Sequence, residues 1–175
     1  MNHAVIKMYL IIRKLWATSA SIPQNVKLKL VKTFLIPILS YGGLIYSDID
    51  SASREKLQLC LNNAARFVFG KRKYDHISTY ASQIVNNITV HFRIQNLIFL
   101  HKLIHTGAPN YLYSKIIFSR STRTCNITVP EYKYLVSSRL FFVNAAKLWN
   151  SLPNDVKRLQ NLQHFRLAVT KFFDS

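Results

Sequence analysis

Acidic residues are scarce in this sequence of 175 residues. Seven Asp and Glu stand against 24 Lys and Arg, which gives a net charge of +17 and a pI near 10.2. Because an excess of one sign repels itself, it predicts a polyanionic partner. Nucleic acid is the commonest such partner, since cations that neutralise phosphates release bound counterions. An anionic membrane, organelle targeting and the lack of any specific partner are the alternatives.

The few carboxylates also bear on catalysis. A two-metal nuclease or polymerase needs clustered carboxylates. Asp48 and Asp50 are close together, but they precede a predicted helix, whose positive dipole end favours acidic residues. The sequence contains no glycine-rich phosphate loop and no HExxH pattern. We therefore expect no catalytic site, no metal and no cofactor.

Cysteine, glycine and proline are rare as well. The two cysteines, Cys60 and Cys125, are too few for a disulfide framework or a zinc site. The four glycines and five prolines argue against disorder, and hydrophobic residues make up 49% of the chain. The longest uncharged run, Thr33 to Ser47, is short for a membrane span and contains Pro37. A buried core is expected, and no membrane partner.

Apolar residues recur at spacings of three and four along most of the chain, which predicts helices. Asp75 and Thr89 should cap two of them, Pro37 should kink one, and Gly70 and Gly107 should end two others. The expected helices cover residues 3–19, 23–40, 51–69, 75–85, 90–107, 109–117, 137–153, 154–160 and 162–173.

Residues 119–136 differ from the rest, because they are rich in Ser, Thr and cations and lack a helical period. They predict a basic loop or a short hairpin. The expected fold is mainly α, a bundle of about seven or eight helices. The change in composition divides the chain into a bundle at 1–118 and a second part at 119–175, in which the loop and the C-terminal helices pack on the bundle.

Histidines and basic clusters supply the candidate functional residues. His101 and His105 lie one helical turn apart, which favours a polar stripe over a metal site without a third ligand. Asp75 and His76 favour a cap and a phosphate-facing His over a catalytic dyad. Tyrosines near the cations can stack on unpaired bases, or can simply pack. The predicted nucleic-acid-binding residues are Arg66, Lys71, Arg72, Lys73, His76, Arg120, Arg123, Lys157 and Arg158.

The N-terminal segment also has the composition of a targeting signal. Residues 3–19 form a predicted basic amphipathic helix, which is typical of mitochondrial presequences. A nuclear or cytoplasmic location is favoured, with mitochondrial targeting by residues 1–20 as the alternative.

Four segments in this order resemble the C-terminal part of a non-LTR retrotransposon reverse transcriptase of the jockey-like group. They are "VKTFLIPILSYGGLIYSD", "REKLQLCLNNAARFVFGKRKYDHIS", "RIQNLIFLHKLIHTGAPNYL" and "RLFFVNAAKLWNSLPNDVKRLQNLQHFRLAVTKFF". The resemblance covers about residues 25–173 and implies a thumb-like helical region at 1–118, followed by a C-terminal extension. In that family the thumb grips template and primer.

The palm aspartates of the family, including the ADD-type motif, do not occur in this sequence. The resemblance therefore implies a truncated or separately encoded tail: a non-catalytic, sequence-nonspecific binder of RNA or DNA without a small-molecule substrate. The alternatives are part of an active reverse transcriptase whose palm is supplied elsewhere, and a retroelement-derived product with no selected function. A palm domain or a second copy are further expected partners. Without a palm domain, the surface that the palm would cover is open. The set Ile12, Trp16, Phe34, Ile38 and Tyr46 should then include partly exposed side chains.

Overall fold

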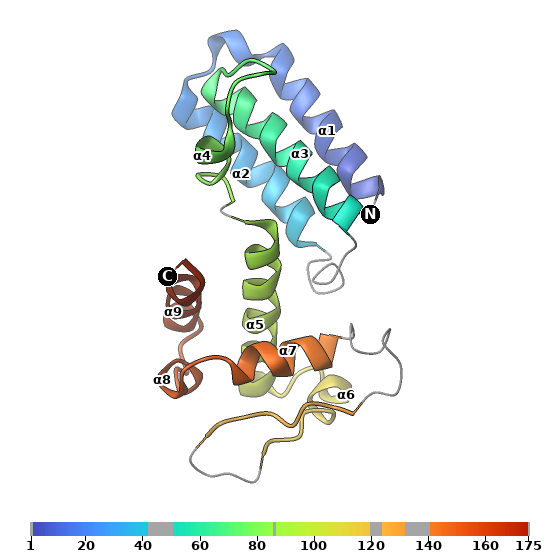
Figure 1. The fold of residues 1–175 in the computed structure, drawn as a ribbon, viewed down its shortest axis with the longest axis vertical. Coiled ribbons are helices and arrows are strands. Elements are labelled where there is room, and N and C mark those ends of the chain that lie inside the picture. Colours follow the sequence, from blue (N-terminus) through green and yellow to red (C-terminus); the bar gives the residue numbers. More distant parts are fainter. Residues whose placement is uncertain (1, 42–50, 86, 120–123, 132–140, 175) are drawn as a thin grey trace. The chain divides into compact units, whose positions relative to one another are not determined.

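The computed structural model describes residues 2–41, 51–85, 87–119, 124–131 and 141–174. Within these ranges the protein is mainly helical, with nine α-helices and one short 3-10 turn, η1 (Ser19–Ser21) (Figure 1). The predicted fold class is confirmed. The chain forms two compact units, residues 1–91 and 92–175. They divide inside a helix, and not between residues 118 and 119, where the composition changes.

The first unit is built on three long helices, α1 (Asn2–Ala17), α2 (Gln24–Ser40) and α3 (Ser51–Phe69). These helices pack against one another, and the short α4 (Ser78–Ala81) packs on α3 (Figure 1). Each long helix buries residues spaced three or four apart, because that spacing places side chains on one face. The buried set includes Val5, Met8, Ile12, Val31, Leu35, Leu39, Leu57, Cys60, Leu61, Ala64, Phe67 and Val68.

Two glycines end helices as the sequence predicted. Gly70 follows α3 with a φ of 63°, and the Lys71 N–H donates to the carbonyl of Arg66 at 3.1 Å. Gly107 follows α5 (Ile88–Thr106) with a φ of 65°, and its own N–H donates to the carbonyl of Leu103 at 3.0 Å. A left-handed residue satisfies the last free carbonyls of a helix in this way, and glycine adopts it without a Cβ clash.

The predicted caps were wrong. Asp75 does not cap α4, because its Oδ2 accepts the backbone N–H of Arg72 at 2.8 Å. At the start of α5 the side chain of Asn87, not Thr89, accepts a backbone N–H, that of Thr89, at 2.8 Å. Pro37 lies inside α2, in a helix that continues to Ser40.

The second unit contains the rest of α5 together with α6 (Asn110–Tyr113), α7 (Phe141–Asn150), α8 (Asn154–Lys157) and α9 (Leu162–Asp174). Trp149 belongs to its core and is only 2% exposed. Its ring centroid is 5.8 Å from that of Phe165. The core consists of Leu97, Leu100, Ile127, Ala145, Ala146, Trp149, Leu152, Phe165 and Val169.

A short antiparallel pairing joins the chain around Phe118 to the chain around Ile127. The Ser119 N–H donates to the carbonyl of Asn126 at 2.9 Å, and the Thr128 N–H donates to that of Ile117 at 2.8 Å. This pairing forms the described part of the predicted basic loop or hairpin.

Apolar side chains on α1 and α2 are partly exposed, as expected. Trp16 is 43% and Phe34 48% exposed, whereas Ile12 is buried; Tyr46 lies outside the described residues. Within the described residues, no helix combines the length and hydropathy needed to cross a membrane.

Candidate nucleic-acid interface

Residues 70–77, here called the α3–α4 segment, form a tight turn directly after α3. The Arg72 N–H donates to Asp75 Oδ2 at 2.8 Å, and the Asp75 N–H donates to the Arg72 carbonyl at 3.2 Å. Arg66, in the last turn of α3, donates from Nε to the same Arg72 carbonyl at 3.2 Å. These three hydrogen bonds fix the middle of the segment, and one of them uses the only carboxylate that the segment contains.

The cations of the α3–α4 segment lie beside aromatic rings. Lys71 Nζ is 4.7 Å from the ring centroid of Tyr80, and Lys73 Nζ is 5.6 Å from that of Tyr74. Tyr74 is 89% exposed. Within the described residues no carboxylate pairs with Lys71, Arg72 or Lys73, because Asp75 bonds the backbone. Three positive charges and one free ring face thus stand together on the surface.

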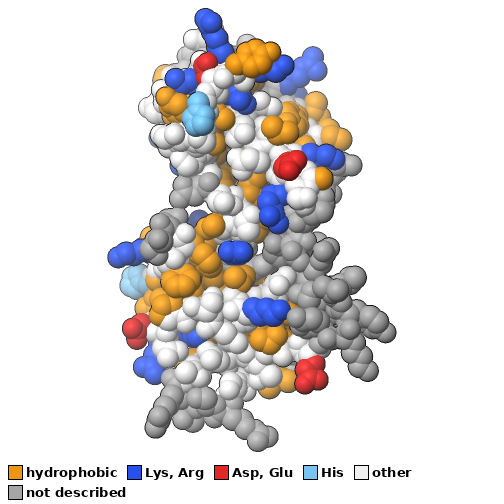
Figure 2. Space-filling model, in the orientation of Figure 1, with side chains coloured by type: hydrophobic (Ala, Val, Ile, Leu, Met, Phe, Trp, Pro, Cys, Tyr) orange, Lys and Arg blue, Asp and Glu red, His pale blue; other side chains and the backbone are white. Residues whose placement is uncertain are grey.

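Lys27, on α2, lies near the end of α3 that precedes the α3–α4 segment, and it was not among the residues predicted to bind nucleic acid. Its Nζ lies 5.5 Å from the ring centroid of Phe67, near the end of α3. On the face drawn in Figure 2, Lys and Arg side chains gather at the end of the unit where the α3–α4 segment lies in Figure 1. Only the packing of α2 on α3 brings Lys27 to this end, so local sequence patterns carried no signal for it.

A hollow of about 530 Å³ lies between the α3–α4 segment and α3. The side chains of Gln58 and Asn62 line it from α3, and Tyr74, His76 and Ser78 line it from the turn and α4. Gln58 Nε2 donates to Asn62 Oδ1 at 3.0 Å. An aromatic ring beside amide and imidazole groups suits a flat ligand with a polar edge, such as a nucleobase. Sequence reasoning missed both amides.

His76 is exposed, and its Nε2 lies 2.6 Å from the hydroxyl oxygen of Ser78. The neighbouring Asp75 carboxylate bonds to the Arg72 N–H, and among the described residues no carboxylate bonds to the His76 ring, as a catalytic histidine would need. Across the described ranges, no three His, Cys, Asp or Glu side chains gather as a metal site would require.

Two of the remaining predicted residues, Lys157 and Arg158, lie in the second unit. Arg158 is exposed, but Lys157 is only 6% exposed and donates from Nζ to Asn126 Oδ1 at 2.8 Å and to the Asn150 carbonyl at 3.2 Å. Arg120 and Arg123 lie outside the described residues. Arg66, Lys71, Arg72, Lys73 and His76 come together in the first unit.

The predicted polar stripe on α5 was wrong for His101, which is buried. Its Nε2–H donates to the carbonyl of Leu159 at 2.6 Å, and its ring stacks on Phe165 with centroids 4.1 Å apart. Burial lowers the pKa of His101, so the ring is held neutral. His105, one turn further along, remains exposed.

The chain matches no protein-family profile, no curated protein and no solved structure.

Proposed function

We propose that the protein binds RNA or DNA without sequence specificity and without catalysis. The α3–α4 segment would hold the phosphates, and Tyr74 would stack on an unpaired base. One observation carries this proposal. Lys71, Arg72 and Lys73 have no carboxylate partner in the described structure, and they adjoin a tyrosine ring that is 89% exposed. Cations next to free ring faces are the combination that grips single-stranded nucleic acid.

The hydrogen bonds of the segment add to this argument. Arg66 and Asp75 fix the turn through the Arg72 carbonyl and N–H, so its cations are presented on ordered backbone. A preformed surface loses less conformational entropy on binding than a loose loop does. In this proposal Arg66 is chiefly a positioning residue, and a base displaced from its strand would enter the hollow beside Gln58 and Asn62.

The resemblance to the C-terminal part of a reverse transcriptase supports the same function, because the thumb of that family grips template and primer. We propose that the chain derives from such a retroelement. A primer-extension assay with Mg²⁺ or Mn²⁺ separates binding from polymerisation. We expect no nucleotide incorporation by the pure protein, and incorporation would favour a residual or complemented polymerase instead.

The binding proposal is tested by changing Lys71, Arg72 and Lys73 together to Gln. Affinity for both RNA and DNA oligonucleotides should fall. The slope of log K against log salt should decrease by about 0.7–0.9 for each phosphate that the variant no longer neutralises. Fluorescence anisotropy over a range of salt concentrations measures both quantities.

A matched control removes the same charge from the second unit. It changes three exposed lysines, Lys102, Lys115 and Lys171, to Gln. This variant should keep most of the affinity and the salt slope. If the two triple variants bind equally well, the α3–α4 segment is not the interface.

A further inference from the structure

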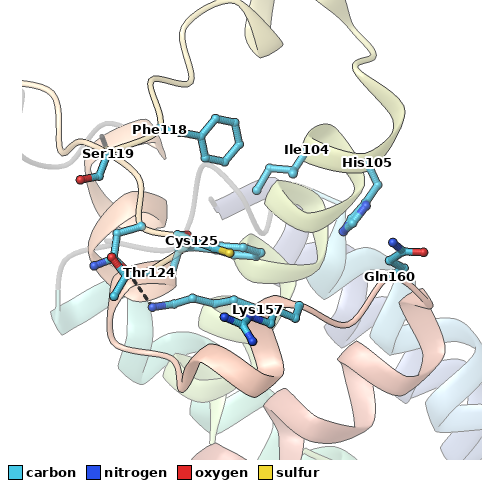
Figure 3. A pocket seen from close by; sticks show the side chains of 11 residues that line it. Ile104, His105, Phe118, Ser119, Thr124, Cys125, Lys157 and Gln160 are labelled. Atoms are coloured by element: carbon cyan, nitrogen blue, oxygen red, sulfur yellow. Dashed lines mark hydrogen bonds between the residues drawn. The ribbon is translucent and has the colours of Figure 1, made fainter. Parts of the chain in front are cut away.

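The second unit contains a hollow of about 360 Å³ next to the buried Lys157 (Figure 3). Ile104 and His105 line it from α5, and Phe118 lines it from the short pairing. Cys125 and Lys157 lie across the hollow from these three side chains (Figure 3). All of these residues belong to the same compact unit.

Lys157 is a buried cation without a described counter-charge. Two of the three N–H donors of its ammonium group bond the Asn126 side chain and the Asn150 carbonyl. Both acceptors are uncharged, and within the described residues no carboxylate pairs with Lys157. Taking a charge out of water costs free energy unless an opposite charge offsets it. Burial accordingly lowers the pKa of Lys157.

The walls of the hollow supply further hydrogen-bond donors and no acidic group among the described residues. Ser119 and Thr124 contribute hydroxyls, Arg158 a guanidinium and His105 an imidazole. Arginine and lysine together bind phosphate oxygens through charge-assisted hydrogen bonds, which are stronger than neutral ones. The polar part of the hollow is therefore complementary to an oxyanion.

The apolar walls limit the ligand further. Ile104, Phe118 and the ring of Trp149 line the same hollow. An inorganic ion alone would leave these surfaces uncovered, whereas a sugar or a base attached to a phosphate would cover them. A volume of about 360 Å³ lies within the usual range for small-molecule sites.

We infer that this hollow binds a phosphate group carried on a nucleotide, with Lys157 and Arg158 supplying the positive charge and the apolar wall contacting the nucleoside. The phosphate can come from a free mononucleotide or from the 5′ end of a nucleic-acid strand. This site is separate from the α3–α4 segment and does not depend on it. The opposing interpretation is that Lys157 only ties α8 to Asn126 and needs no anion.

Trp149 provides the signal for a binding experiment. The sequence contains two tryptophans, so Trp16→Phe leaves Trp149 as the sole indole fluorophore. In this background, inorganic phosphate and AMP should change the fluorescence of Trp149 saturably, and AMP should bind more tightly. Chloride at equal ionic strength should not. A 5′-phosphorylated oligonucleotide that competes better than its 5′-hydroxyl counterpart identifies a strand end as a source. Equal competition identifies the free mononucleotide.

Substitutions then locate the site. Arg158→Gln changes an exposed side chain and should fold normally. It should weaken AMP binding by about tenfold or more, because it removes one charge-assisted hydrogen bond to the phosphate. Lys102→Gln, an exposed position on α5 outside the hollow, should bind AMP as the parent does. Lys157→Met should abolish binding, with circular dichroism as the check of its fold. If it does not fold, Arg158→Gln decides.

Two results would overturn the site: no saturable response to phosphate or AMP, or an unchanged affinity in Arg158→Gln. Lys157 would then serve only to hold the fold together. The test is independent of the proposed nucleic-acid interface. The Lys71, Arg72 and Lys73 triple variant should retain AMP binding even though it binds strands weakly.

Discussion

The side-chain amide of Asn150 makes two hydrogen bonds with the backbone of Ile127. Its Nδ2 donates to the Ile127 carbonyl at 2.8 Å, and its Oδ1 accepts the Ile127 N–H at 2.9 Å. The amide thereby makes the pair of hydrogen bonds that a residue of a neighbouring β-strand would make. Trp149 Nε1 donates to the Cys125 carbonyl at 2.7 Å. Consecutive side chains at the end of α7 thus hold one short stretch of chain against the core of the second unit.

Asn150→Ala should destabilise the second unit markedly. It leaves an N–H and a carbonyl of buried Ile127 without partners, at a cost of about 1–3 kcal/mol for each group. Urea unfolding followed by Trp149 fluorescence, in the Trp16→Phe background, measures the effect. Asn154→Ala removes an exposed amide nearby and should leave the midpoint unchanged. Equal midpoints for the two variants would show that the amide pair contributes little.

Tyr74→Ala should weaken the binding of single strands more than that of duplexes. The exposed ring can stack only on an unpaired base, and such a stack is worth about 1–3 kcal/mol. Tyr74→Phe keeps the ring and should bind as the parent does. Anisotropy with matched single- and double-stranded oligonucleotides measures the difference. An equal decrease on both substrates would argue for a backbone contact rather than stacking.

The stability of the second unit should fall as the pH drops below about 6.5, the ordinary pKa of histidine. Burial lowers the pKa of His101, so just below that pH the unfolded chain binds a proton at this residue and the folded chain does not. Acidification therefore favours the unfolded state. The contribution of His101 is complete above pH 6.5 and is lost on acidification. The neighbouring His105 ring, 4.2 Å away between centroids, adds repulsion when both are charged.

His101→Gln should flatten this pH dependence, because the amide can still donate to Leu159 but does not titrate. His164→Gln, at an exposed position on α9, should not change it. Thermal melting of the three proteins between pH 5 and pH 8 is the measurement. A pH dependence that persists in His101→Gln would assign it to another group.

The two cysteines should differ in reactivity. Burial raises the pKa of the Cys60 thiol to about 12, whereas Cys125 is exposed. Because the thiolate is the reactive form, a thiol reagent at pH 8 should label Cys125 quickly and Cys60 only after unfolding. Mass spectrometry of the native and the urea-treated protein counts the labels. Rapid double labelling of native protein would mean that the core of the first unit opens readily.

The helices followed from the sequence because their period depends on local spacing alone. Apolar residues three and four apart predicted α3, and Gly70 predicted its end. The hydrogen-bond partners of individual side chains were not predictable in the same way. Asp75 had the local signature of a cap, yet a backbone N–H within the α3–α4 segment takes its carboxylate.

Composition and short-range periodicity were sufficient to predict the helical class, most helix ends and the strongly basic character of the chain. Which cations face solvent depends on how the helices pack. Lys71 and Lys157 look alike in the sequence. Lys71, however, lies in the turn of the α3–α4 segment beside the ring of Tyr80, whereas Lys157 is buried against Asn126 and Asn150. Whether a charge faces water or the interior depends on residues distant in the chain, because burial is a property of the packed fold and not of the local pattern.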